Sequence, residues 1–186
     1  MHLSFKRKSL VCLASARTTC TCDLIARLDD SEKIIIFSER TKQADELYQL
    51  LQKSYPEKVG RYHSKMGKWA NRNVLDRFRE GSVRILIACK AIDEGIDVPD
   101  ASVGIIMSGT STQRQRIQRL GRIIRKNNGK ERSALYYLHI TETSEDSCFL
   151  PDAANHRLFE LTYDSLKHYF TNPAYDEKAL SLLNDM

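Results

Sequence analysis

The sequence predicts an α/β domain with a mostly parallel central sheet flanked by helices. Short runs rich in β-branched residues alternate with segments whose apolar residues recur at helical spacing. A strand buried on both faces is a continuous apolar run, whereas a surface helix shows one apolar stripe, so this alternation indicates strand–helix–strand units. The 186 residues are 41% hydrophobic, which is enough for one domain with a core.

The first strand is predicted at residues 33–37 (KIIIF), after a helical N-terminal region. The next helix is predicted over residues 41–55, with Ala44, Leu47 and Leu51 on one face and Thr41 as its N-cap. Residues 59–64 (VGRYHS) form a short extended segment.

A second helix is predicted over residues 71–80, with Val74, Leu75 and Phe78 facing inward and Gly81 as its stop. Further strands are predicted at residues 83–89 (VRILIAC), 102–109 (SVGIIMSG) and 133–140 (SALYYLHI). Residues 141–186 interrupt the alternation and predict two peripheral helices. We therefore divide the chain into a helical lead-in (1–22), an α/β domain (23–140) and an acidic helical extension (141–186).

Charge is unevenly distributed along the chain. Residues 1–140 hold 26 Lys and Arg against 15 Asp and Glu, whereas residues 141–186 hold 3 against 9. A basic body indicates a polyanionic partner. Charge by itself also fits a solvated basic surface without a ligand.

The strongest concentration of charge is residues 113–126 (QRQRIQRLGRIIRK), with five arginines and one glycine. On a helical wheel Ile117, Leu120 and Ile124 form a buried stripe. Outside it lie Gln115, Gln118, Arg119, Arg122 and Arg125. Guanidinium groups are planar, always charged and bidentate, so they suit phosphate. The wheel alone leaves open a solvated basic helix with ordinary salt bridges.

These segments resemble the motifs of superfamily 2 helicases. Residues 118–125 (QRLGRIIR) resemble motif VI, residues 85–102 (ILIACKAIDEGIDVPDAS) resemble motif V, and residues 33–51 are similar to motif IV. The three elements occur in the family's order and spacing over roughly residues 23–140. The resemblance implies the second, C-terminal RecA-like domain of such a helicase, a three-layer sandwich with a mostly parallel central sheet.

The resemblance also implies roles for single residues. Arg122 and Arg125 match the arginines that act as arginine fingers on the ATP phosphates, stabilising charge on the transferred phosphoryl group. Gly95, Asp97 and Gln118 match ATP-binding positions, with Asp97 accepting hydrogen bonds from a ribose hydroxyl.

Nucleic-acid contacts are implied at the ends of three strands. Many relatives have a threonine where Ala88 and Cys89 stand. Here either backbone amides make that contact or the contact is weaker. His63 is expected to act as a loop or backbone contact rather than as a general base. Trp69 is expected to pack on the core, stacking on a base being the other interpretation. The predicted nucleic-acid-binding positions are Ser38, Arg40, His63, Ser64, Ala88 and Cys89.

The chain contains no G-x-x-x-x-G-K-[ST] loop and no D-E-x-[DH] element after a buried strand. We therefore expect a first RecA-like domain outside this sequence to bind most of the ATP and Mg²⁺, and the isolated chain to be inactive. The expected partners are that domain and a nucleic acid, with DNA favoured over RNA by the wording of motif VI. No metal site and no membrane segment are predicted.

The sequence also fits two alternatives. One is a stand-alone nucleic-acid-binding or regulatory module with a degenerate helicase fold. The other is an unrelated α/β protein whose arginine helix holds a phosphorylated small molecule. The five cysteines are scattered without zinc spacing, which indicates free thiols and a cytoplasmic or nucleoid-associated location.

Overall fold

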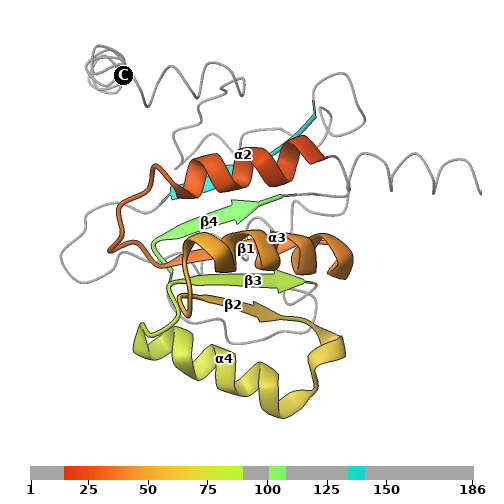
Figure 1. Cartoon of the computed structure of the whole chain (residues 1–186), viewed down its shortest axis with the longest axis vertical. Helices are drawn as coiled ribbons and strands as arrows, with labels where there is room; N and C mark the ends of the chain where they lie inside the picture. The colour runs from red at the N-terminus through yellow and green to blue at the C-terminus, as the bar shows by residue number, and fades with distance from the viewer. Residues whose placement is uncertain (1–14, 90–100, 108–133, 141–186) are drawn as a thin grey trace, which may run out of the picture. The chain divides into compact units, whose positions relative to one another are not determined.

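The computed structural model of the chain describes residues 15–89, 101–107 and 134–140 (Figure 1). These residues contain one all-parallel sheet with the strand order β2-β3-β1-β4-β5. The parallel α/β class is therefore confirmed. Each strand falls on a segment predicted to be extended, although β1 ends one residue beyond the predicted 33–37. The strands are β1 (Ile34–Ser38), β2 (Val59–Tyr62), β3 (Ile85–Cys89), β4 (Val103–Ile106) and β5 (Ala134–Tyr137).

The helices cover both faces of this sheet. They are α2 (Ser15–Ile25), α3 (Thr41–Ser54), the 3₁₀ turn η1 (Ser64–Met66) and α4 (Lys68–Glu80). The chain moves two places along the sheet from β1 to β2 and returns one place from β2 to β3. Because parallel crossovers are right-handed, α3 and α4 lie on opposite faces. Figure 1 shows α3 in front of β1 and β3, and α4 beside β2.

The alternation of side chains along β1 divides the core between the two faces. Ile35 and Phe37 belong to one buried cluster with Val74 and Phe78 of α4. Ile34 and Ile36 point to the other face, which α3 covers, and both are fully buried. Burial on both faces explains why the strand is a continuous apolar run in the sequence.

The start of α3 differs from the prediction, because Thr41 is the first helical residue and not the N-cap. Arg40 occupies the N-cap position, with an extended backbone (φ −118°, ψ 124°) and no side-chain capping hydrogen bond. The turn is shaped by Ser38, whose hydroxyl lies 3.1 Å from the Arg40 carbonyl oxygen. The stop of α4 is as predicted, since Gly81 adopts the left-handed conformation with φ 83°.

The expectation that Trp69 packs on the core is wrong. Its side chain is 80% exposed. Helix α4 begins at Lys68, three residues before the predicted start at Asn71. At ~100° per residue, nine residues place Trp69 half a turn away from the fully buried Phe78.

Helix α2 is joined to the sheet by a buried arginine. Arg17 is 3% exposed. Its Nη1 donates to the carbonyl oxygens of Met107 and Leu138, just beyond the ends of β4 and β5. No helix in the described part of the chain is long and apolar enough to span a membrane. The predicted arginine helix, the motif V loop and the helices of residues 141–186 lie outside the described residues.

Candidate functional site

The candidate site is the edge of the sheet at which the parallel strands end. Ser38 pairs with Cys89 in register, and Tyr62 pairs with Ala88, so β1, β3 and β2 finish side by side. Ligands of open α/β sheets bind in the loops at this edge. The structure therefore brings together the strand ends that hold the six predicted nucleic-acid-binding positions.

The Ser38 hydroxyl is used within the domain. Ser38 is 4% exposed. Its Oγ lies 3.1 Å from the Arg40 carbonyl oxygen and 3.1 Å from Oε1 of Gln43. These contacts fix the turn between β1 and α3. A nucleic-acid contact by Ser38 stays a prediction, and it would require the hydroxyl to exchange one of these partners.

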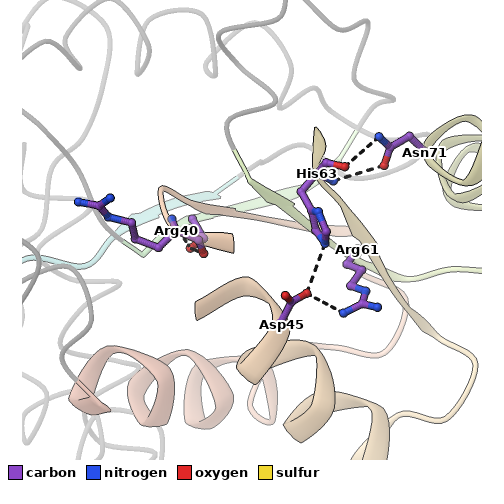
Figure 2. A network of polar contacts seen from close by, with 6 residues as sticks. Arg40, Asp45, Arg61, His63 and Asn71 are labelled. Atoms are coloured by element: carbon purple, nitrogen blue, oxygen red, sulfur yellow. Dashed lines mark hydrogen bonds and ion pairs between the residues drawn. The ribbon is translucent and has the colours of Figure 1, made fainter. Parts of the chain in front are cut away.

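Arg40 is half-buried and lies directly after this turn. Figure 2 shows its guanidinium pointing away from the polar group around His63. The side chain thus starts at the carboxyl edge of the sheet, beside the end of β1. Its role toward a nucleic-acid backbone stays a prediction.

The His63 side chain is directed at α3. It is 5% exposed. Its Nε2 lies 3.3 Å from Oδ1 of Asp45, within ion-pair range but without the alignment of a hydrogen bond. The same Asp45 oxygen accepts a hydrogen bond from Nη1 of Arg61 at 2.6 Å, and the Arg61 guanidinium lies 4.8 Å from the centre of the Tyr48 ring. Asp45 therefore joins α3 to the end of β2 through its contacts with Arg61 and His63.

The backbone of His63 is held by a second side chain, Asn71 of α4 (Figure 2). Its Oδ1 accepts from the His63 amide at 3.3 Å, and its Nδ2 donates to the His63 carbonyl oxygen at 3.0 Å. Asn71 is 9% exposed. One carboxamide thus satisfies both backbone groups of the residue that follows β2, and it ties the start of α4 to the strand end.

The remaining predicted positions at this edge differ in exposure. Ala88 and Cys89 are 1% and 2% exposed, so their side chains belong to the sheet. Any ligand contact at the end of β3 would therefore use the backbone, which is one of the two expected alternatives. Ser64 is exposed at the start of η1. None of these roles is tested by the arrangement itself.

The predicted ATP-site residues all lie outside the described residues, and their roles stay predictions. They are Gly95, Asp97, Gln118, Arg122 and Arg125. Within the described ranges, no group of three or more His, Cys, Asp or Glu side chains gathers that could hold a metal ion.

Two residues that organise this edge were missed by the sequence analysis. Asp45 looks like an ordinary solvent-facing acid of an amphipathic helix, and Asn71 sits where a helix was expected only to begin. The sequence feature that could have identified Asp45 and Asn71 is a polar residue in each helix at a position that faces the end of β2. That signal becomes visible only when the packing of α3 and α4 on β2 is known.

Comparison with known protein families agrees with this geometry. A family model described as the helicase conserved C-terminal domain matches residues 16–127. The DNA 3'-5' translocase XPB2 of Sulfurisphaera tokodaii is 40% identical over 116 residues, which cover 62% of this chain and 24% of that protein. The pre-mRNA-splicing ATP-dependent RNA helicase PRP28 of Debaryomyces hansenii is 35% identical over 96 residues, covering 51% of this chain and 16% of that protein.

Solved structures show the same fold. The C-terminal domain of the DEAD-box protein Dbp5 superimposes with a TM-score of 0.57 at 24% identity, covering 68% of this chain and 72% of that chain. The yeast DEAD-box splicing factor Prp28 gives a TM-score of 0.56 at 25% identity, covering 70% of this chain and 28% of that chain. The chain thus matches most of one solved domain but less than a quarter of the length of the two sequence relatives.

Proposed function

Because this chain belongs to the helicase conserved C-terminal domain family of superfamily 2, we propose that it forms the second half of an ATP-dependent nucleic-acid motor. The observation that supports this most is the extent of the family match. It begins at the start of α2, spans the described sheet through β4, and ends at residue 127, just after the predicted arginine fingers. The relatives named above are a DNA translocase and an RNA helicase, each several times longer than the matched region.

In this proposal the chain supplies positive charge to a nucleotide held between two domains. The Arg122 and Arg125 guanidinium groups stabilise the negative charge that develops on the transferred phosphoryl group. Gly95 permits a close backbone approach, while Asp97 and Gln118 orient the nucleotide. ATP supplies the phosphoryl group. A first RecA-like domain provides most of the contacts to ATP and Mg²⁺.

The chain also supplies part of the nucleic-acid track. The adjacent ends of β1, β3 and β2 form a row of strand termini, where backbone amides and the side chains of Arg40 and Ser64 meet the phosphates. Contacts to phosphate are largely independent of base sequence. They weaken as the salt concentration rises, because releasing the counterions of the nucleic acid then gains less entropy. The two domains would close on ATP and open after hydrolysis. Each change would strengthen or weaken the binding of the nucleic acid to this track. We propose DNA as the polymer, because the motif VI wording is closer to DNA-translocating members.

The test is ATP hydrolysis by the full-length protein that contains this chain. Turnover is measured without nucleic acid and with single-stranded DNA, double-stranded DNA and RNA, for the wild type and for Arg125→Ala. We expect stimulated turnover to fall by ~10³ or more in the variant, which is the effect of removing an arginine finger. The polymer that stimulates most identifies the substrate.

Arg79→Ala is the matched control, since Arg79 lies in the last turn of α4, at the amino end of the sheet, and pairs with Asp76 at 2.8 Å. Its turnover should equal that of the wild type. The isolated chain should hydrolyse essentially no ATP. Turnover that is indifferent to Arg125→Ala would remove the arginine helix from the ATP site and leave it as a basic nucleic-acid surface.

A further inference from the structure

The most exposed large apolar side chain of the described residues is Trp69, at 80%. It lies in the first turn of α4 and is the one tryptophan in the 186-residue sequence. A lone exposed apolar side chain is common on protein surfaces and needs no explanation. A binding role for Trp69 therefore depends on what surrounds the indole ring.

The surroundings are basic. Lys65 of η1 and Lys68 and Arg72 of α4 are all exposed, and they lie within four residues of Trp69 in the sequence. The first turn of α4 contains no acidic residue, and its N-cap, Gly67, provides no side-chain cap. The first acid along the helix is Asp76, which is 2.8 Å from Arg79 and 4.0 Å from Arg72. The N-terminus of α4, where Trp69 lies, thus combines cationic side chains with the positive end of the helix dipole.

The backbone beneath Trp69 is held firmly at the carboxyl edge of the sheet. Asn71, two residues further on, clamps the backbone of His63 with two hydrogen bonds (Figure 2). Gly67, two residues before Trp69, turns the chain into α4 with φ 79°, which glycine tolerates. Trp69 therefore lies in the first turn of a helix that begins at the carboxyl edge of the sheet, the edge that holds the predicted nucleic-acid track.

We propose that Trp69, Lys65, Lys68 and Arg72, hereafter the Trp69 surface, bind single-stranded nucleic acid. The indole ring stacks on an unpaired base, and the three cations contact the flanking phosphates. Aromatic rings in basic surroundings bind single strands in this way with little sequence preference. The inference rests on the proposed function, and it adds to the phosphate track a contact that recognises an unpaired base.

The composition of the surface favours a nucleic acid over a protein partner. Protein interfaces have an apolar centre built from several contiguous side chains. Among the described residues, the other exposed large hydrophobic side chains are Leu50 in α3 and Leu135 in β5. Trp69 is thus the exposed large hydrophobic side chain of its own helix, and the charged residues within four positions of it are all cations.

The test uses the intrinsic fluorescence of the single tryptophan in the full 186-residue chain. The chain is titrated at about 50 mM salt with oligothymidylate of about 20 nucleotides, with an abasic oligodeoxynucleotide of the same length, and with a blunt duplex. Anisotropy of dye-labelled copies measures binding independently of the indole ring. We expect oligothymidylate to quench Trp69, and the abasic strand and the duplex to bind with little quenching.

Variants then separate stacking from charge. Trp69→Ala should weaken oligothymidylate binding about 5- to 150-fold and leave abasic-strand binding unchanged, because only stacking is lost. Trp69→Phe should restore part of the affinity. Lys68→Gln should weaken the binding of all three ligands. It should also reduce the slope of log K against log salt concentration by about one unit. Lys53→Gln, an exposed lysine in the last turn of α3 at the opposite edge, is the matched control and should change nothing.

The outcomes distinguish this inference from the proposed function. If oligothymidylate binds without quenching and Trp69→Ala binds like the wild type, the stacking proposal is overturned while the nucleic-acid track remains. Equal quenching by duplex and single strand also overturns it, since a paired base cannot stack on the ring. If no oligonucleotide binds at all, both the Trp69 surface and the track on this chain are excluded.

Discussion

At the scale of single residues, two cysteines of α2 show how position sets chemistry. Cys20 is buried at 9% exposure, whereas Cys22 is half-buried. Burial raises the pKa of the Cys22 thiol above its ordinary value, and the nearby Asp23 carboxylate raises this pKa further. Both causes disfavour the thiolate, so the structure predicts a thiol of low reactivity at neutral pH.

We predict that Cys22 in the folded chain reacts with iodoacetamide at a higher midpoint pH than in the urea-unfolded chain. Because the pKa is raised on folding, the unfolded state loses its proton first as pH increases. The contribution of the protonated Cys22 thiol to the free energy of unfolding is fully present below the pKa of the unfolded state. It declines as pH rises toward the pKa of the folded state. Alkylation mapped by mass spectrometry between about pH 7 and about pH 10 measures the midpoint.

Asp23→Asn should move the midpoint of Cys22 part of the way down, because it removes the second cause and leaves burial unchanged. A midpoint in the folded chain equal to or below that of the unfolded chain would contradict the prediction.

At the scale of elements, the contact between α4 and β2 depends on the absence of a side chain at Gly60. A Cβ atom added at Gly60 would lie 2.3 Å from Cγ2 of Val74 and 3.1 Å from Cγ1 of Val83. The helix therefore packs directly on the strand backbone. This close approach also brings Asn71 within hydrogen-bond distance of His63 and so positions the start of α4.

We predict that Gly60→Ala destabilises the chain by about 1–3 kcal/mol, the usual cost of overpacking a core. Urea unfolding followed by far-ultraviolet circular dichroism measures the change. Val74→Ala should also destabilise, but the double variant should be more stable than the sum of the two changes predicts, because the small residue makes room for the new methyl group. Strictly additive effects would show that α4 can move away from the strand without cost.

At the scale of the whole described structure, Arg17 joins segments that are distant in the sequence. It lies 90 residues before Met107 and 121 residues before Leu138, and its guanidinium bridges their carbonyl oxygens. The sheet ladder ends nearby, where the Met107 amide donates to Phe37 and the Leu138 amide to Ile106. Arg17 thus supplies donors where the next strand residues would otherwise have been needed.

We predict that Arg17→Met lowers the free energy of unfolding by about 2–4 kcal/mol. Methionine keeps much of the apolar stem but leaves a buried and a partly buried carbonyl oxygen without this donor. Arg72→Met is the control, because Arg72 has an 86% exposed side chain and should change stability by no more than about 0.5 kcal/mol. Equal urea midpoints for the two variants would show that the bridge contributes nothing.

Local patterns in the sequence determined the elements and the class of this protein. The apolar runs of β1, β3 and β4 predicted buried parallel strands, because a strand covered on both faces has no polar alternation. The spacing of Ala44, Leu47 and Leu51 predicted α3, and the positive φ at Gly81 ends α4 where a glycine was expected. The motif order in residues 33–125 predicted the helicase family that the comparisons confirm.

Only the tertiary structure decided how these elements present their side chains at the carboxyl edge. Whether Trp69 is buried depends on where α4 begins and which face it turns to β2, and a difference of a few residues reverses the answer. His63 contacts Asp45 and Asn71, and Arg17 contacts the ends of two strands. No local sequence pattern around these residues predicts that they meet. Such contacts depend on the strand order and on helix packing, which are set by long-range interactions rather than by any local pattern.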